Sequence, residues 1–310
     1  MKRPLVFIGE PKSGKTVLYL RLRALLTALV ARTRIDETDA RTDSRVTDSL
    51  RLSDWLHRDE SQIDFVGWFI RHVQHSDVAH YRESQATSEL LRVPQSQLME
   101  GCWPDATTST QRGWMRVTRA GFFGTLGYEF DVHDYCGEVV ARAFPNVTTT
   151  QTAPLNAAPA PSTPEADAET LKGQLKDGAI VVFVIDGKEL LEGGLPLVTE
   201  RAVAAILDAR EAPFASILAR FFCIVTKMDE VNLATSVPLE RSISSPKEYL
   251  QRHHASFWNH LKSLEAEYLE VVAVATRISP KGERLPMVAP QIFDRSLVKF
   301  ATWLFRAVQD

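Results

Sequence analysis

The chain has 310 residues, of which 45% are hydrophobic and 24% charged, as is ordinary for a soluble globular protein with a large core. Its formal net charge of -3 provides no overall attraction to nucleic acid or to an anionic membrane. The longest apolar run, residues 179–185, is far shorter than the ~20 residues that span a bilayer. Three scattered cysteines without metal-ligand spacing are typical of a reducing compartment. We therefore expect a cytoplasmic protein without a signal peptide.

The first predicted elements are a buried strand over residues 4–8 and a helix over residues 17–26. Between them, residues 9–16 read GEPKSGKT, which fits the phosphate-binding pattern G-x-x-x-x-G-K-[ST] in the strand-loop-helix context that it requires. Gly9 and Gly14 leave room for backbone N–H groups to converge on an anion. The following helix adds the positive end of its dipole, so this stretch predicts a phosphate site.

Within this loop, Lys15 is expected to reach the β- and γ-phosphates, and the Thr16 hydroxyl is expected to bind Mg²⁺. Lys12 and Ser13 complete the predicted binding loop. A chance Gly/Lys turn is the alternative, which the flanking strand and helix disfavour. The motif predicts a nucleoside triphosphate but does not name the base.

A long segment of residues 34–105 separates the first helix from the next strand signals. Apolar side chains recur at helical spacing over residues 50–56 and 65–73, which predicts two short helices with one buried face each. The histidines of this segment have no matching cysteine or carboxylate spacing, so a metal site is not expected. We interpret the segment as a partly helical insertion.

A hairpin is predicted next, because residues 112–120 alternate like a half-exposed strand and residues 128–132 form a second strand after the glycine-rich turn of residues 121–127. The pattern D-x-x-G then runs from Asp134 to Gly137. The Asp134 carboxylate can hold Mg²⁺ through water, and the Gly137 N–H can bond a γ-phosphate. Alone, this spacing often marks only a turn, but after a phosphate loop and a hairpin it predicts a nucleotide-sensing segment.

Residues 143–172 are rich in Pro, Ala and Thr, which predicts a flexible loop because they bury little apolar surface. Regular elements then resume in alternation, with strands at 179–185, 221–225 and 269–275 and helices at 198–209, 246–268 and 293–308. This alternation predicts a mainly parallel sheet covered on both faces. The expected fold is a single three-layer α/β/α domain over residues 1–310, with the insertion before the hairpin.

Residues 226–229 read TKMD directly after a predicted strand. The Asp229 carboxylate can accept two hydrogen bonds from the N1–H and N2–H₂ edge of guanine, which adenine lacks, while the Lys227 stem can lie over the ring. The motif thus favours GTP over ATP, since the wrong base leaves a buried carboxylate unpaired. Asp229 could equally cap a helix N-terminus, and an ATPase of similar topology is the rival interpretation.

In this order, the phosphate loop, D-x-x-G and T-K-x-D resemble the translation-factor-related (TRAFAC) class of P-loop GTPases, which includes small GTPases and heterotrimeric G-protein α subunits. The resemblance covers most of the chain except residues 34–105 and 143–172. It implies that the fifth guanine motif runs from Val274 to Thr276, with a backbone N–H of Ala275 or Thr276 meeting the guanine O6.

The resemblance also implies a threonine before the second strand that closes over Mg²⁺ and the γ-phosphate. Thr107 or Thr108 fits this role first, and Thr110 is the next choice. The W-P-x-x-T text that ends at Thr107 is similar to the GTPase domains of bacterial double-GTPase systems. No arginine directly precedes Thr107, so the arginine that G-protein α subunits carry in cis is not evident, and a partner or a second copy could supply one.

Two positions depart from the family pattern. Glu138 stands where small GTPases place a water-orienting glutamine; its carboxylate can orient or deprotonate water but repels phosphate, which implies slow hydrolysis. Lys12, at the fourth loop position, could supply positive charge to the transition state in cis, although a solvent-facing lysine is an equal alternative.

These patterns predict a GTP-binding molecular switch that hydrolyses GTP slowly with Mg²⁺, with Lys15, Glu138 and Lys12 as its catalytic residues. The expected ligands are GTP and GDP, and the expected partner is a protein effector or activator. A homodimer or a partner GTPase is compatible with the prediction, whereas nucleic acid and membrane are not expected as partners. The rival from another class is a non-hydrolysing scaffold, GTP-bound or nucleotide-free, in which Glu138 marks lost catalysis.

Overall fold

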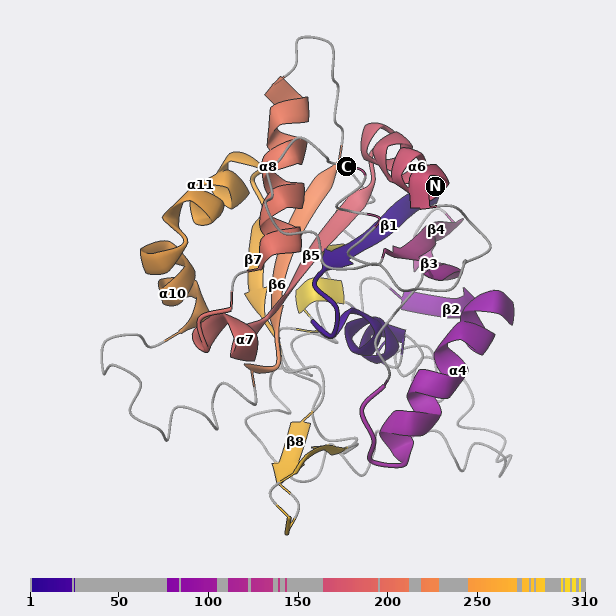
Figure 1. The fold of residues 1–310 in the computed structure, drawn as a ribbon. Coiled ribbons are helices and arrows are strands. Elements are labelled where there is room, and N and C mark those ends of the chain that lie inside the picture. Colours follow the sequence, from indigo (N-terminus) through magenta and orange to yellow (C-terminus); the bar gives the residue numbers. More distant parts are fainter. Residues whose placement is uncertain are drawn as a thin grey trace.

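The fold is described by a computed structural model in which the following residues are placed: 2–23, 25, 77–83, 85–104, 111–121, 124–135, 139, 143, 164–194, 196–211, 219–228, 245–271, 275–278, 280–281, 283–287, 297, 299–301, 303–304 and 307. A seven-stranded sheet lies at the centre, in the order β2-β3-β4-β1-β5-β6-β7, and helices flank it on both sides (Figure 1). A separate two-stranded sheet pairs β8 with β9.

The strands are β1 (Lys2–Gly9), β2 (Asp77–Glu83), β3 (Gln111–Gly121), β4 (Gly124–Asp134), β5 (Ile180–Asp186), β6 (Arg220–Thr226), β7 (Glu267–Glu270), β8 (Ala275–Ile278) and β9 (Arg284–Met287). The helices are α4 (Gln85–Met99), α6 (Pro164–Lys176), α7 (Gly187–Leu191), α8 (Leu197–Glu211), α10 (Pro246–His253) and α11 (Ala255–Ser263). Residues 15–23 and the described residues between 297 and 307 are also helical. None of the helices that the structure describes is long and apolar enough to cross a membrane.

The α/β prediction is confirmed by the strand pairing. β4, β1, β5, β6 and β7 run parallel, and β3 pairs antiparallel with β4 in the predicted hairpin. The second strand of the hairpin is longer than predicted, because the glycine-rich residues from Gly124 onward already belong to β4. The antiparallel β2 extends the sheet at its edge.

Two apolar clusters, one on each face of the sheet, form the core. Side chains alternate between the faces of a strand, so Leu5 and Phe7 pack with the first helix and α4, whereas Val6 and Ile8 pack with α6, α8, α10 and α11. β5 is buried along its whole length, as expected of a central parallel strand. The chain is therefore a three-layer α/β/α structure.

The strand pairing places the carboxyl ends of the five parallel strands at one edge of the sheet. β1 lies between β4 and β5, and the chain leaves the carboxyl end of β1 through the predicted phosphate loop. In open α/β sheets, ligands bind outside the carboxyl ends of the strands, where the strand order reverses direction. Residues 9–16 therefore lie at the edge of the sheet where a ligand is expected.

The expectation that no strand occurs before about residue 105 is wrong, because β2 lies within the predicted insertion. Its sequence, DVAHYRE, does not alternate between apolar and polar residues, so it gave no strand signal. β2 lies at the edge of the sheet and pairs with one strand, β3. The Arg23 guanidinium, on the first helix, donates to the Glu83 carboxylate at the end of this strand. The two short helices predicted over residues 50–56 and 65–73 lie outside the described residues.

The prediction of a flexible loop over residues 143–172 is wrong from Pro164 onward, because α6 begins there. Proline is favoured in the first turn of a helix, where its missing N–H removes no hydrogen bond. Ala168, Leu171 and Leu175 are buried against the sheet, and Asp167 pairs with Arg112 of β3. The apolar spacing of these residues was hidden by the Pro- and Ala-rich text before them.

The helix predicted over residues 246–268 is two helices. Its backbone leaves the helical conformation at His254, where φ is -129° and ψ is 47°, and α11 ends before β7 begins at Glu267. β7 is thus earlier and shorter than the strand predicted over residues 269–275. Apolar residues recur at helical spacing on both sides of His254, so the sequence pattern did not predict the break between the two helices.

Candidate functional site: a phosphate loop joined to three strand ends

The loop of residues 9–16 turns tightly between β1 and the first helix. Ser13 N donates to the Glu10 carbonyl at 3.2 Å, and the helix starts with Leu18 N donating to the Gly14 carbonyl at 2.8 Å. Lys12 and Gly14 have positive φ angles of 64° and 91°. The left-handed region favours glycine, so Gly14 suits its position, whereas Lys12 holds a conformation that few side chains adopt.

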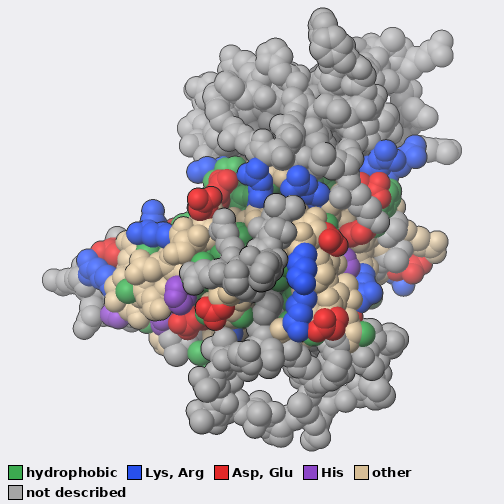
Figure 2. Space-filling model, turned by 90° about the horizontal axis from the view of Figure 1, so that it is seen from above, with side chains coloured by type: hydrophobic (Ala, Val, Ile, Leu, Met, Phe, Trp, Pro, Cys, Tyr) green, Lys and Arg blue, Asp and Glu red, His purple; other side chains and the backbone are tan. Residues whose placement is uncertain are grey.

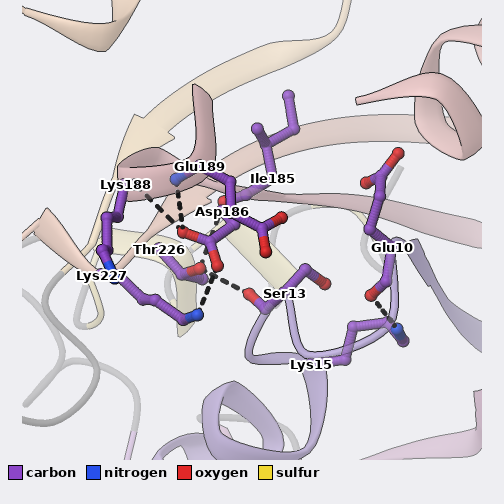
Figure 3. Close-up of polar contacts among 9 residues, drawn as sticks. All are labelled: Glu10, Ser13, Lys15, Ile185, Asp186, Lys188, Glu189, Thr226 and Lys227. Carbon is purple, nitrogen blue, oxygen red and sulfur yellow. Dashed lines mark hydrogen bonds and ion pairs between the residues drawn. The ribbon is translucent and has the colours of Figure 1, made fainter. Parts of the chain in front are cut away.

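Lys15 lies inside the loop and is 5% exposed. Its ammonium donates to the Glu10 carbonyl at 3.0 Å (Figure 3). It also donates to the Gly9 carbonyl at 3.1 Å. Within the described residues no carboxylate pairs with Lys15, so its charge is held by neutral carbonyl oxygens alone. The ammonium can therefore pair with an anion such as a phosphate without first breaking an ion pair.

Thr16 and Asp134 are brought into contact. The Thr16 hydroxyl donates to the Asp134 carboxylate at 3.1 Å, and Asp134, the last residue of β4, is 4% exposed. Hydroxyl and carboxylate oxygens are the protein ligands that Mg²⁺ prefers, usually one or two of them together with water and substrate phosphates. The two residues fit such an ion, although the described part of the chain contains no group of three or more His, Cys, Asp or Glu that could hold a metal alone.

Thr226, at the end of β6, joins the T-K-x-D segment to the loop. Its hydroxyl donates to the Ser13 carbonyl at 2.6 Å and lies 3.2 Å from the Ile185 carbonyl (Figure 3). A Cβ added at Gly14 would lie only 3.3 Å from this hydroxyl oxygen. The ends of β5 and β6 are thereby packed directly against the phosphate loop.

Lys227 follows with a positive φ of 57° and pairs with Asp186 at the end of β5. Asp186 is 4% exposed and also caps α7, since its other oxygen accepts hydrogen bonds from the backbone N–H groups of Lys188 at 3.0 Å and Glu189 at 3.2 Å. Sequence reasoning missed Asp186. A carboxylate at the end of a wholly apolar strand was the available signal.

Glu10 was also missed as a functional side chain. Its carboxylate accepts hydrogen bonds from the backbone N–H groups of Val198 at 2.8 Å and Thr199 at 3.2 Å, and from the Thr199 hydroxyl at 3.0 Å. Burial raises the pKa of Glu10, and the hydrogen bonds from Thr199 and Val198 act in the opposite direction. No sequence signal connects position 10 with α8, because 188 residues separate the partners.

A small recess opens beside the loop, between Glu10, the end of β5 and the segment that leads to α8. Three of its lining residues are Glu10, Asp186 and Glu189. Three carboxylates make this recess unsuitable for a phosphate. An anion would therefore lie on the opposite side of the loop, toward Lys15.

Several predicted site residues lie outside the described residues: Thr107, Thr108, Thr110, Gly137, Glu138, Asp229 and Val274. Ala275 and Thr276 are described, but they begin β8, where they pair with Met287 and Pro286 of β9. Lys12 is exposed. The structure thus brings together Gly9, Ser13, Gly14, Lys15, Thr16, Asp134, Thr226 and Lys227.

No protein-family model and no curated protein match the sequence. Among solved structures, the chain is similar to the Ski7 GTPase-like domain of S. cerevisiae, a structure bound to GDP and inorganic phosphate. The sequence identity is 10% and the TM-score 0.40, and the alignment covers 100% of this chain and 50% of that chain. This chain thus spans half the length of its structural neighbour.

Proposed function

We propose that this protein binds a guanine nucleotide at the carboxyl edge of the sheet and hydrolyses GTP slowly with Mg²⁺, as a nucleotide-dependent switch. The observation that carries the proposal is the hydrogen bond from the Thr226 hydroxyl to the Ser13 carbonyl at 2.6 Å. It joins the segment with the base-reading pattern to the loop with the phosphate-binding pattern, so one nucleotide could contact both.

The phosphate-binding part of the proposal rests on Lys15 and the loop backbone. Lys15 is buried and has only carbonyl partners within the described residues. Phosphate oxygens in their place would add the attraction of opposite charges to these hydrogen bonds. In phosphoryl transfer, such groups stabilise the charge that spreads over the γ-phosphate oxygens while water attacks in line. Lys15 is thus the residue on which turnover depends most.

The metal part of the proposal rests on the contact between Thr16 and Asp134. Thr16 would bind Mg²⁺ directly and Asp134 would hold its water shell, with Thr107 or Thr108 as the further ligand. The ion would neutralise charge on the phosphate oxygens when bound. Asp134 would orient the Thr16 hydroxyl, whose proton it already accepts at 3.1 Å.

The base preference rests on Asp229 and Lys227. Lys227 is 26% exposed and is held by Asp186, which supports a role in which its stem covers a base while its ammonium stays paired. Asp229 would accept both N–H donors of guanine. Glu138 and Lys12 remain the proposed water-orienting and charge-supplying residues, and a non-hydrolysing scaffold is the outcome to be distinguished from this proposal.

The test is competition of GTP, GDP and ATP for the purified chain with Mg²⁺, followed by phosphate release in the same sample. We expect GTP and GDP to bind, ATP to bind at least about tenfold more weakly, and phosphate to be released slowly. Lys15→Ala should remove both activities, whereas Lys172→Ala, which replaces a partly exposed lysine of α6, should change neither.

A different experimental result would contradict each part of the proposal. Equal binding of ATP, or unchanged GTP affinity in Asp229→Asn, would contradict the guanine preference. Guanine binding without any phosphate release would support the scaffold instead of the enzyme. Absence of nucleotide binding in the unmodified chain would overturn the proposed function as a whole.

A further inference from the structure

Glu10 links the phosphate loop to a helix that is remote in sequence. Its carboxylate oxygens accept three hydrogen bonds from the first turn of α8, two from the backbone N–H groups of Val198 and Thr199 and one from the Thr199 hydroxyl. The first N–H groups of a helix have no partner within the helix, so a side chain from elsewhere can satisfy them. Glu10 acts as this outside cap for α8.

The backbone of the same residue shapes the loop. The Glu10 carbonyl accepts hydrogen bonds from Ser13 N at 3.2 Å and from the Lys15 ammonium at 3.0 Å. Figure 3 shows the Glu10 side chain turned away from Lys15, while its carbonyl faces the ammonium. The loop and the helix therefore share one residue as their connection.

α8 is a firm anchor for this connection. Thr199 has no exposed surface, and Ala202, Val203 and Ile206 of the same helix are fully buried in the cluster that also holds Val6 and Ile8 of β1. A loop fixed to such a helix keeps its position relative to the sheet.

A carboxylate at this place has an electrostatic disadvantage. It lies in the phosphate loop beside Asp186 and Glu189, so it would repel a bound phosphate, and its burial also disfavours the charged form. An uncharged side chain with the same hydrogen-bonding oxygen would avoid both effects. The favourable interactions of the carboxylate at this position are its three hydrogen bonds to α8.

We propose that Glu10 is a positioning residue for the nucleotide: its carboxylate ties the phosphate loop to α8 and keeps the loop N–H groups convergent on the phosphate site. This inference rests on the proposed function. When only a fraction of molecules holds the competent loop, the apparent Kd rises in inverse proportion to that fraction. Loss of the hydrogen bonds between Glu10 and α8 should therefore weaken nucleotide binding, although the Glu10 side chain itself donates no hydrogen bond to the ligand.

The test compares Glu10→Ala with Glu10→Gln by titration of the purified chain with GDP and Mg²⁺. The glutamine keeps an oxygen for the backbone N–H groups of Val198 and Thr199 and an amide group that can donate to the Thr199 hydroxyl. We expect Glu10→Ala to weaken GDP binding about fivefold or more, in line with the loss of a helix cap. Glu10→Gln should stay within about twofold of the unmodified chain or bind more tightly, because it also removes a negative charge.

A control variant separates positioning from loss of stability. Val203→Ala truncates a buried side chain of α8 that belongs to the apolar cluster and not to the loop. It should lower the thermal unfolding temperature at least as much as Glu10→Ala, yet leave GDP affinity within about twofold. Hydrogen exchange at the Val198 and Thr199 amides should be faster in Glu10→Ala and unchanged in Glu10→Gln.

The inference is overturned if Glu10→Ala binds GDP as tightly as Glu10→Gln, or if Val203→Ala weakens binding as much as Glu10→Ala. Either result can occur while the unmodified chain binds GDP normally, and then the proposed function stands without the tether. Failure of the unmodified chain to bind any nucleotide would instead overturn the proposed function.

Discussion

Gly9, the last residue of β1, pairs with Val184 of β5. A Cβ added there would lie 2.3 Å from the Val184 carbonyl oxygen and 2.8 Å from the Ser13 hydroxyl oxygen. The first of these atoms belongs to the backbone of a buried central strand, which has little freedom to move. The first glycine of the loop is therefore required by packing as well as by the approach of a ligand.

Gly9→Ala should lower the free energy of unfolding by about 2 kcal/mol or more, because overpacking forces one of the two strands to shift. Urea denaturation measures this change. The matched control is Gly173→Ala in α6, where an added Cβ meets nothing within 4 Å and should stabilise the helix by about 0.5–1 kcal/mol. Equal stability of the two variants would contradict the close approach at Gly9.

The buried Glu10 carboxyl predicts a pH dependence of stability. Burial raises its pKa in the folded state above the ordinary value of 4.5, so the folded chain binds more protons than the unfolded chain just above that pH. This residue's contribution to stability therefore decreases as the pH rises from 4.5 through the raised folded pKa. The side chain in Glu10→Gln does not titrate. The free energy of unfolding of this variant, relative to that of the unmodified chain, should therefore increase between pH 4.5 and the raised folded pKa of Glu10 and then level off.

Urea denaturation of both proteins at several pH values checks this prediction, since all other titrating groups are common to the pair. A stability difference that stays constant with pH would contradict it.

At the scale of elements, α6 covers the end of the hairpin that carries Asp134. Arg112 of β3 pairs with Asp167 of α6, and the hydroxyl of Tyr135, the residue after Asp134, donates to Gln174 at 2.9 Å. Burial raises the pKa of Tyr135, so the phenol is held in its neutral, donating form. The helix thus supports the strand end that carries Asp134, the carboxylate proposed to hold the water shell of Mg²⁺.

Leu171→Ala should destabilise the protein by about 2–4 kcal/mol, because this α6 side chain is fully buried and its loss leaves a cavity. Thermal or urea unfolding measures the effect. The neighbouring Lys172→Ala removes only a surface ion pair with Glu169 and should change stability by no more than about 0.5 kcal/mol. A small effect of Leu171→Ala would mean that α6 does not dock as described.

At the scale of the whole molecule, the sheet separates two apolar clusters and carries the candidate site at one edge. Figure 2 shows that basic and acidic side chains are interspersed on the face drawn, in keeping with the formal net charge of -3. Of the two lysines in the loop of residues 9–16, Lys12 is exposed, whereas Lys15 lies inside the fold. Binding would therefore couple to the stability of the folded state.

A ligand that binds only the folded chain should raise the free energy of unfolding by about 2.7 kcal/mol at 100 times its Kd. We expect GDP with Mg²⁺ to produce this shift in thermal unfolding and ATP to produce much less. Chelation of Mg²⁺ should reduce the shift given by GTP, since Thr16 and Asp134 would lose the ion that joins them to the phosphates. An equal shift in Lys15→Ala would contradict binding at the phosphate loop.

The local parts of the site could be predicted from the amino-acid sequence. A strand, a glycine-bounded loop and a helix are contiguous in residues 4–26, and their pattern requires no knowledge of distant residues. Apolar runs also predicted β5 and β6, whose carboxyl ends meet the loop, because buried parallel strands are apolar throughout. The contact of Thr16 with Asp134 follows from the same order of elements.

Only the tertiary structure decided the connections between segments that are remote in sequence. The capping of α8 by Glu10 and the pairing of Lys227 with Asp186 depend on how strand ends and helices pack, and a single polar residue carries no periodic signal of its partner. β2 was missed for a related reason, since an edge strand needs no apolar alternation. Sequence by itself predicted a phosphate-binding loop, because the pattern is local and contiguous, whereas packing determined which remote residues hold the loop in place.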